Sequence, residues 1–159
     1  MHTVRDLLIR KPPKIVMIDP RCTTRQTLLK MGECGVGALL VADNEGNLEG
    51  IVTEHDISKG AVKFGDTLLK QPANDLMTAN LITCDITDSV VDALVIMNGG
   101  RIGHLLVIDG GEAVGMLNVR DMLAVCIEGM RSDDSILRKQ LVDASWAGGP
   151  AGTETWLSA

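Results

Sequence analysis

An internal repeat limits what this chain can fold into more than any other feature of its sequence. Shifting the 159-residue sequence by 66 positions, which places residue 31 on residue 97, aligns one half with the other. The aligned pairs are Asp19 with Asp85, Thr23 with Ser89, Leu28 with Leu94, Met31 with Met97 and Gly37 with Gly103. After a one-residue deletion the offset becomes 65, which aligns Gly50 with Gly115 and Asp56 with Asp121. The repeat predicts two copies of one structural unit that pack against each other.

Within each copy the residue pattern predicts the element order strand, helix, strand, strand, helix. Short apolar runs bounded by turn residues are typical of strands. They occur at residues 15–18, 38–42, 48–52, 81–84, 104–108 and 113–117. Thr23 and Ser89 are suited to cap the first helix of each copy, because a hydroxyl accepts a backbone N–H while Gln26 or Asp92 reciprocates. The second helices are predicted over residues 54–64 and 119–130.

The predicted fold class is therefore α/β, of the mixed α+β kind, with two βαββα copies packed with pseudo-two-fold symmetry. One three-stranded sheet with two helices cannot bury both of its faces, so the copies are expected to share a core. Asp6-Leu7-Leu8 is mirrored by Asp75-Leu76-Met77, which indicates a short lead-in helix or turn before each copy. We predict the copies at residues 4–67 and 73–130, and a C-terminal helix with a flexible tail at residues 131–159.

Charge, aromatic content and hydropathy exclude several classes of partner. A net charge of −6 and a pI near 5.0 disfavour binding to nucleic-acid phosphates. Only Phe64, Trp146 and Trp156 could stack on bases, so a single-strand platform is not expected. The chain begins without the apolar stretch of a secretory signal, and no apolar run approaches the roughly 18 residues of a membrane span. We therefore expect a cytoplasmic protein without a membrane or nucleic-acid partner.

The four cysteines do not indicate a metal or redox site. They are widely spaced and form no Cys-x-x-Cys pair, which argues against a zinc cluster and a dithiol motif. Cys84 has no basic residue adjacent in sequence that would lower its pKa, so we interpret it as an inert core thiol. We predict no metal site.

One motif recurs at the junction between the last strand and the last helix of each copy. Its two forms are Gly50-Ile51-Val52-Thr53-Glu54-His55-Asp56-Ile57 and Gly115-Met116-Leu117-Asn118-Val119-Arg120-Asp121-Met122. Glycine, two apolar residues, a short polar residue, two variable residues and then Asp at such a turn resemble the signature of the CBS (cystathionine β-synthase-type) repeat. The resemblance covers residues 4 to 130 and is greatest to short bacterial proteins made only of a CBS pair.

The residue types in this motif suit a nucleotide for physical reasons that do not depend on the family. A helix N-terminus that opens into a cleft presents unpaired N–H groups and the positive end of the helix dipole, which favour phosphate. A carboxylate one turn into the helix can accept both hydroxyl groups of a ribose. The polar side chain at the start of the helix can reach the phosphate or the sugar.

The resemblance assigns roles to individual residues. It implies that Asp56 and Asp121 bind ribose, and that Thr53 and Asn118 contact ribose or phosphate. The first strand of the opposite copy would receive the base, through Ile82 and Thr83 in one cleft and Val16 and Met17 in the other. Because Thr83 matches the family pattern and Met17 does not, we expect the cleft of Thr53 and Asp56 to bind more tightly.

A second segment resembles the family's phosphate-contacting strand. Arg101-Ile102-Gly103-His104-Leu105-Leu106-Val107 is similar to the family's Arg-His-Leu-Pro-Val, with Leu106 in place of proline. His104 is the phosphate candidate, and Arg120 at the cleft mouth would add positive charge. The expected ligand is AMP, ADP, ATP or an NAD-type dinucleotide, and no catalytic cofactor is expected.

Alternative interpretations exist for the motif and for the whole chain. In the alternative interpretation of the motif, Thr53 and Asn118 serve as helix caps and have no ligand role, with Asp56 and Asp121 as their capping partners. The chain would then be an interaction or dimerisation scaffold with vestigial clefts. An enzyme is disfavoured because no phosphate-binding P-loop and no nucleophile with a positioned base are found. We also expect a homodimer, because the helices at residues 89–98 and 119–130 carry more apolar side chains than one small core needs.

Overall fold

The computed structural model describes residues 3–10 and 14–129. The helix and tail predicted at residues 131–159 lie outside this part of the chain. In chain order the elements are α1 (Val4–Arg10), β1 (Met17–Ile18), α2 (Thr24–Cys34), β2 (Ala38–Ala42), β3 (Leu48–Thr53), α3 (Glu54–Phe64), the 3-10 helices η1 (Gly65–Lys70) and η2 (Ala73–Asp75), β4 (Thr83–Asp85), α4 (Val90–Gly100), β5 (His104–Asp109) and β6 (Glu112–Asn118). Residues 119–129 are also helical.

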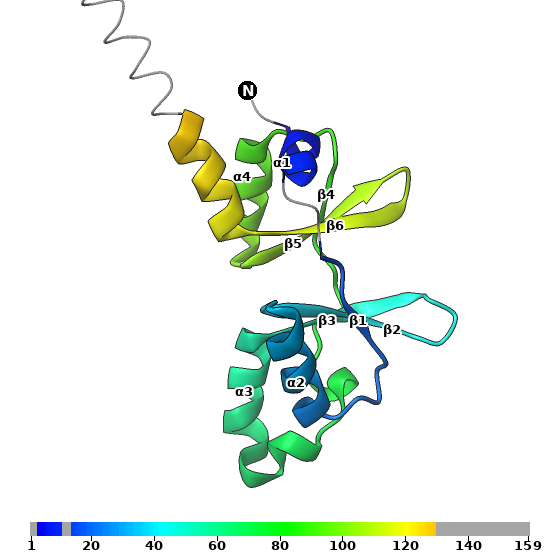
Figure 1. The fold of residues 1–159 in the computed structure, drawn as a ribbon. Coiled ribbons are helices and arrows are strands. Elements are labelled where there is room, and N and C mark those ends of the chain that lie inside the picture. Colours follow the sequence, from blue (N-terminus) through cyan, green and yellow to red (C-terminus); the bar gives the residue numbers. More distant parts are fainter. Residues whose placement is uncertain (1–2, 11–13, 130–159) are drawn as a thin grey trace, which may run out of the picture. The chain divides into compact units, whose positions relative to one another are not determined.

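The two copies form three-stranded sheets of the same topology (Figure 1). In the first sheet β1 runs parallel to β2, and β2 runs antiparallel to β3. In the second sheet β4, β5 and β6 repeat this arrangement. The register shifts between Val41 and Ala42 in one copy and between Val107 and Ile108 in the other, which are equivalent positions of the repeat. The predicted fold class is confirmed, and the two copies also share this irregularity, which the sequence did not predict.

The first helix of each copy starts at the residue that the sequence indicates. The Thr23 hydroxyl accepts the N–H of Gln26 at 3.3 Å, and the Gln26 side chain accepts the N–H of Thr23 at 2.8 Å. Both halves of a capping box are therefore formed. In the second copy the Ser89 hydroxyl accepts the N–H of Asp92 at 3.0 Å, while its own O–H bonds to the Asp92 carboxylate.

The central strand of each sheet lies deepest in the core. All five residues of β2 are buried, and Leu105, Leu106 and Val107 of β5 are at most 2% exposed. Strands covered on both faces show continuous apolar runs instead of alternation, which explains why these two were the clearest in the sequence. Val90 and Met122, from the two helices whose apolar side chains were expected to exceed the needs of the core, are buried with 2% and 0% exposure.

Each lead-in segment packs on the copy that it does not precede. The N–H groups of Val4 and Arg5 in α1 donate to the carbonyls of Asp88 and Ile86 in the second copy, both at 2.9 Å. Helix α1 also packs against α4 (Figure 1).

The second lead-in reciprocates this arrangement. The N–H of Ala73 donates to Cys22 O at 2.8 Å, and Thr78 pairs with Ile51 of β3. The sequence repeat thus assigns each lead-in to the copy that follows it, whereas the hydrogen bonds place it on the other copy. The boundaries at residues 4–67 and 73–130 stay a prediction from the repeat.

Candidate functional site

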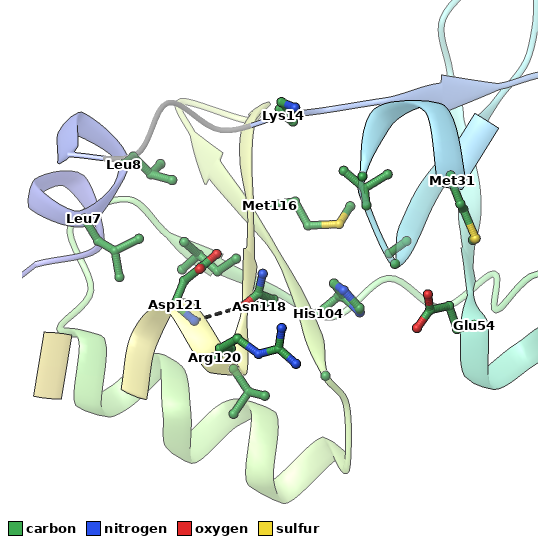
Figure 2. Close-up of a pocket in the computed structure, with 18 of the residues that line it drawn as sticks. Leu7, Leu8, Lys14, Met31, Glu54, His104, Met116, Asn118, Arg120 and Asp121 are labelled. Carbon is green, nitrogen blue, oxygen red and sulfur yellow. Dashed lines mark hydrogen bonds between the residues drawn. The ribbon is translucent and has the colours of Figure 1, made fainter. Parts of the chain in front are cut away.

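A hollow of about 920 Å³ lies where the two copies face each other (Figure 2). The second copy contributes the start of β5 and the turn from β6 into the following helix. The first copy contributes the end of α2, the segment that leads into β2, and single side chains before β1 and at the start of α3. Helix α1 closes one side with Leu7 and Leu8. The residues that line the hollow are Leu7, Leu8, Lys14, Leu28, Met31, Gly32, Gly35, Val36, Gly37, Ala38, Glu54, Gly103, His104, Met116, Leu117, Asn118, Val119, Arg120 and Asp121.

The hollow brings together four of the residues that the sequence singled out. His104, Asn118, Arg120 and Asp121 all line it. The remaining candidates are not among its lining residues: Val16, Met17, Thr53, Asp56, Ile82 and Thr83. The hollow thus contains the turn residues Asn118 and Asp121 of one predicted cleft but not Val16 and Met17, which were expected to receive the base there.

The turn at Asn118 is held by a side-chain cap. Asn118 Oδ1 accepts the N–H of Asp121 at 2.8 Å, drawn as the dashed line in Figure 2. The N–H of Val119 donates to Gly103 O at 3.2 Å, which ties the start of the helix to the start of β5. Asn118 therefore caps this helix. Asp121 also lines the hollow.

His104 lies between two carboxylates. It begins β5, pairs across the sheet with Asn118, and is partly buried. Burial lowers the pKa of His104, while the charges of Glu54 and Asp121 act in the opposite direction. Since burial is the larger effect, the imidazole is neutral near pH 7. A neutral imidazole can donate one hydrogen bond and accept one.

Glu54 and Lys14 also line the hollow, and the sequence analysis did not include them among the candidate residues. A Cβ built on Gly37 would lie 3.4 Å from Glu54 Oε2 and 3.5 Å from His104 Cε1, so these two side chains converge from different copies. The Lys14 ammonium donates to Cys34 O at 3.3 Å, at the end of α2. The repeat alignment could have drawn attention to Glu54, because the equivalent residue of the second copy is the uncharged Val119.

The equivalent turn of the first copy is closed by hydrogen bonds within the chain. Asp56 Oδ2 accepts the N–H of Thr53 at 2.9 Å and its hydroxyl at 2.6 Å. Asp56 Oδ1 accepts the hydroxyl of Thr78 at 3.3 Å. Thr78 also exchanges two backbone hydrogen bonds with Ile51, at 3.0 and 2.9 Å. Both carboxylate oxygens thus have partners in the protein, and Thr53 caps α3 in a capping box.

The two copies differ in side-chain volume at the positions that line the hollow. The first copy lines it with Gly35, Val36 and Ala38, and the equivalent residues of the second copy are Arg101, Ile102 and His104. Ile82 packs against the end of α4 so closely that a Cβ on Gly100 would lie 2.9 Å from its Cδ1. The first copy therefore lines the hollow with smaller side chains than those at the equivalent positions of the second copy.

Other chemistries find little support in the described part of the chain. Within residues 3–10 and 14–129, no group of three or more His, Cys, Asp or Glu side chains is placed to hold a metal ion. No helix among these residues has the length and apolar character that crossing a bilayer requires. Burial, helped by the charges of Asp88 and Asp85, raises the pKa of Cys84 to about 11, as expected for an unreactive core thiol.

Comparisons with known proteins identify both copies. The protein-family model of the CBS domain matches this sequence at residues 4–63 and 73–128. A CBS-domain containing protein of Agrobacterium tumefaciens superposes with a TM-score of 0.74 at 30% identity, covering 77% of this chain and 91% of that one. A CBS domain protein of Pyrobaculum aerophilum, solved in complex with AMP, superposes with a TM-score of 0.65 at 28% identity over 76% of this chain and 89% of its own.

Relatives found by sequence include longer proteins. An uncharacterized 17.7 kDa protein of Acidianus ambivalens is 28% identical over 116 residues, which is 72% of this chain and 69% of that protein. The chain spans only about a third of the length of other curated relatives that it matches, among them an arabinose 5-phosphate isomerase of Yersinia pestis.

Proposed function

Because this chain belongs to the CBS domain family and carries two copies of that domain, we propose that it is a regulatory module that senses an adenine nucleotide. The observation that carries the proposal is the hollow, where groups suited to a sugar, a phosphate and a base lie within one space. The AMP complex of the relative from Pyrobaculum aerophilum supports this class of ligand.

Each part of a nucleotide has a chemically suitable partner in the hollow. The carboxylate of Asp121 can accept hydrogen bonds from both ribose hydroxyls. Arg120 and His104 are donors for a phosphate, and charge-assisted hydrogen bonds from Arg are the stronger of the two. The apolar side chains of Leu8 and Met116 offer a surface for the purine ring (Figure 2).

A ligand in this position would act as a sensor because it touches three separate parts of the fold. The hollow is lined by both copies and by α1, so a bound nucleotide favours the arrangement in which all three are docked. Ligand binding can shift a conformational equilibrium only through such differential contacts. The response would be a change in how the copies pack with a partner protein or with a second chain.

Paired aspartate variants test the proposal. We expect AMP, ADP, ATP or NAD to raise the melting temperature, since a ligand that binds only the folded state stabilises it by mass action. In calorimetry, Asp121→Ala should weaken the binding of the best ligand about 10- to 100-fold, the usual effect of losing hydrogen bonds to a charged group. Asp56→Ala should leave affinity nearly unchanged and lower stability by about 1 kcal/mol, as the loss of a capping partner does.

The same variants separate the structural argument from the sequence argument. The sequence ranks the cleft of Thr53 and Asp56 first, whereas the hollow favours that of Asn118 and Asp121. Loss of high-affinity binding in Asp56→Ala, with Asp121→Ala unaffected, would show that the hollow is not the main site.

A second candidate function is an interaction scaffold. The engaged carboxylate of Asp56 favours it, since that cleft has the bonding pattern of a purely structural turn. Absence of a melting shift with every nucleotide of the panel would support the scaffold and contradict the sensor.

A further inference from the structure

We propose that Glu54 makes the hollow selective for a nucleotide with a single phosphate, an inference that rests on the proposed function and specifies its ligand. Glu54 occupies a variable position of the CBS motif, in the copy opposite to the turn that carries Asp121. Its carboxylate therefore enters the hollow from the wall facing that turn.

The first step is the charge balance of the lining. Lys14 and Arg120 are cationic, and Glu54 and Asp121 are anionic. With the partly buried His104 neutral, these groups sum to zero. A phosphate monoester carries a charge of about −2 at neutral pH. One phosphate can pair with the two cations but already makes the hollow net negative, and each further phosphate adds charge that no lining residue compensates.

The second step is direction. In Figure 2 Asp121 and Arg120 lie left of the centre and Glu54 lies at the right, with His104 between them in this view. With the ribose on Asp121 and the first phosphate on Arg120 and His104, a longer phosphate chain extends toward Glu54. Glu54 and His104 converge on Gly37, so this end of the path is narrow as well as negative.

The magnitude is sufficient to set a preference. Two like charges about 7 Å apart repel by an amount that changes affinity about tenfold, when the effective dielectric constant lies between the protein and water values. The repulsion acts on the additional phosphates of ATP much more than on the first phosphate, because of distance. It should weaken with added salt, since these groups are partly exposed.

The test is calorimetric titration of the full chain with adenosine, AMP and ATP, in the absence of Mg²⁺ so that ATP keeps its full charge. We expect the unmodified protein to bind AMP at least about tenfold more tightly than ATP. Glu54→Gln keeps the shape of the side chain and removes its charge. It should lower the ratio of AMP affinity to ATP affinity about tenfold, because ATP binds more tightly to the variant. Glu54 is exposed, so the variant should fold, and its melting temperature verifies this.

A matched control is Glu33→Gln, which makes the same charge change on α2 at an exposed position outside the lining. It should leave the ratio unchanged. A ratio that stays the same in Glu54→Gln, or an unmodified protein that prefers ATP, overturns the assignment of Glu54 while AMP binding still supports the sensor. Failure of all three ligands to bind overturns the proposed function itself.

Discussion

At the scale of single residues, the surroundings of a side chain decide its chemistry more than its type does. Asp56 and Asp121 hold the same position of a repeated motif, yet Asp56 accepts three hydrogen bonds from Thr53 and Thr78 while Asp121 lines a hollow. Two of these bonds come from Thr53 within the motif, and the third comes from the lead-in residue Thr78, which pairs with β3. A motif match therefore specifies the residue but not the surroundings that it meets.

His104 gives a residue-scale prediction on pH. Its pKa is lowered from the ordinary value of 6.5 mainly by burial, so the unfolded chain takes up a proton more readily than the folded one. The stability linked to His104 is therefore fully present above pH 6.5 and is lost as the pH falls through the lower folded value.

Urea unfolding at pH 7.5 and at pH 5 measures this effect. We expect His104→Gln to lose less unfolding free energy between the two pH values than the unmodified chain. His55→Gln, at an exposed position of α3, is the control and should behave as the unmodified chain. An identical loss in His104→Gln would mean that the carboxylates of Glu54 and Asp121 offset the burial of the ring.

At the scale of elements, the two copies end their first helices in the same backbone conformation with different residues. Gly35 caps α2 with φ 65° and ψ 39°, and Arg101 caps α4 with φ 51° and ψ 41°. This left-handed region suits glycine and costs other residues roughly 1 kcal/mol. Arg101 is the non-glycine residue with positive φ in the described part of the chain.

The strain at Arg101 can be measured by exchanging the cap residues. We expect Arg101→Gly to raise the free energy of unfolding by about 0.5 to 1 kcal/mol, and Gly35→Ala to lower it by about 1 kcal/mol. Chemical denaturation measures both. A loss of stability in Arg101→Gly would show that contacts of the Arg101 side chain outweigh its backbone cost.

Elements were predictable where local signals agree. Strand β2 and helix α3 begin and end at the predicted residues, because a buried central strand and a Thr53 cap are both visible in sequence. The first strands were predicted two residues too early, at residues 15 and 81, and are observed to begin at Met17 and Thr83. Pairing with the central strand sets these boundaries, and a short apolar run does not reveal where that pairing begins.

At the scale of the whole molecule, the exchange of lead-ins and the position of the hollow were beyond sequence reasoning. Asp6-Leu7-Leu8 aligns with Asp75-Leu76-Met77 whether each segment packs on its own copy or on the other, so the repeat cannot distinguish the two. The hollow is lined by residues of both copies and of α1, a combination that follows only from how these parts pack.

Helix α4 carries the prediction that belongs to the assembled protein. Val91 and Val95 lie one turn apart on α4 and are 50% and 65% exposed. They form an apolar strip that faces water in the single chain. We therefore predict a homodimer in which α4 is part of the contact. Sedimentation at micromolar concentration should show a dimer for the unmodified chain and a monomer for Val95→Glu, because a buried unpaired carboxylate disfavours association. Val62→Glu on α3, where the valine is 91% exposed, serves as control and should remain dimeric. A monomeric unmodified chain, or a Val95→Glu variant that still sediments as a dimer, would contradict this role of α4.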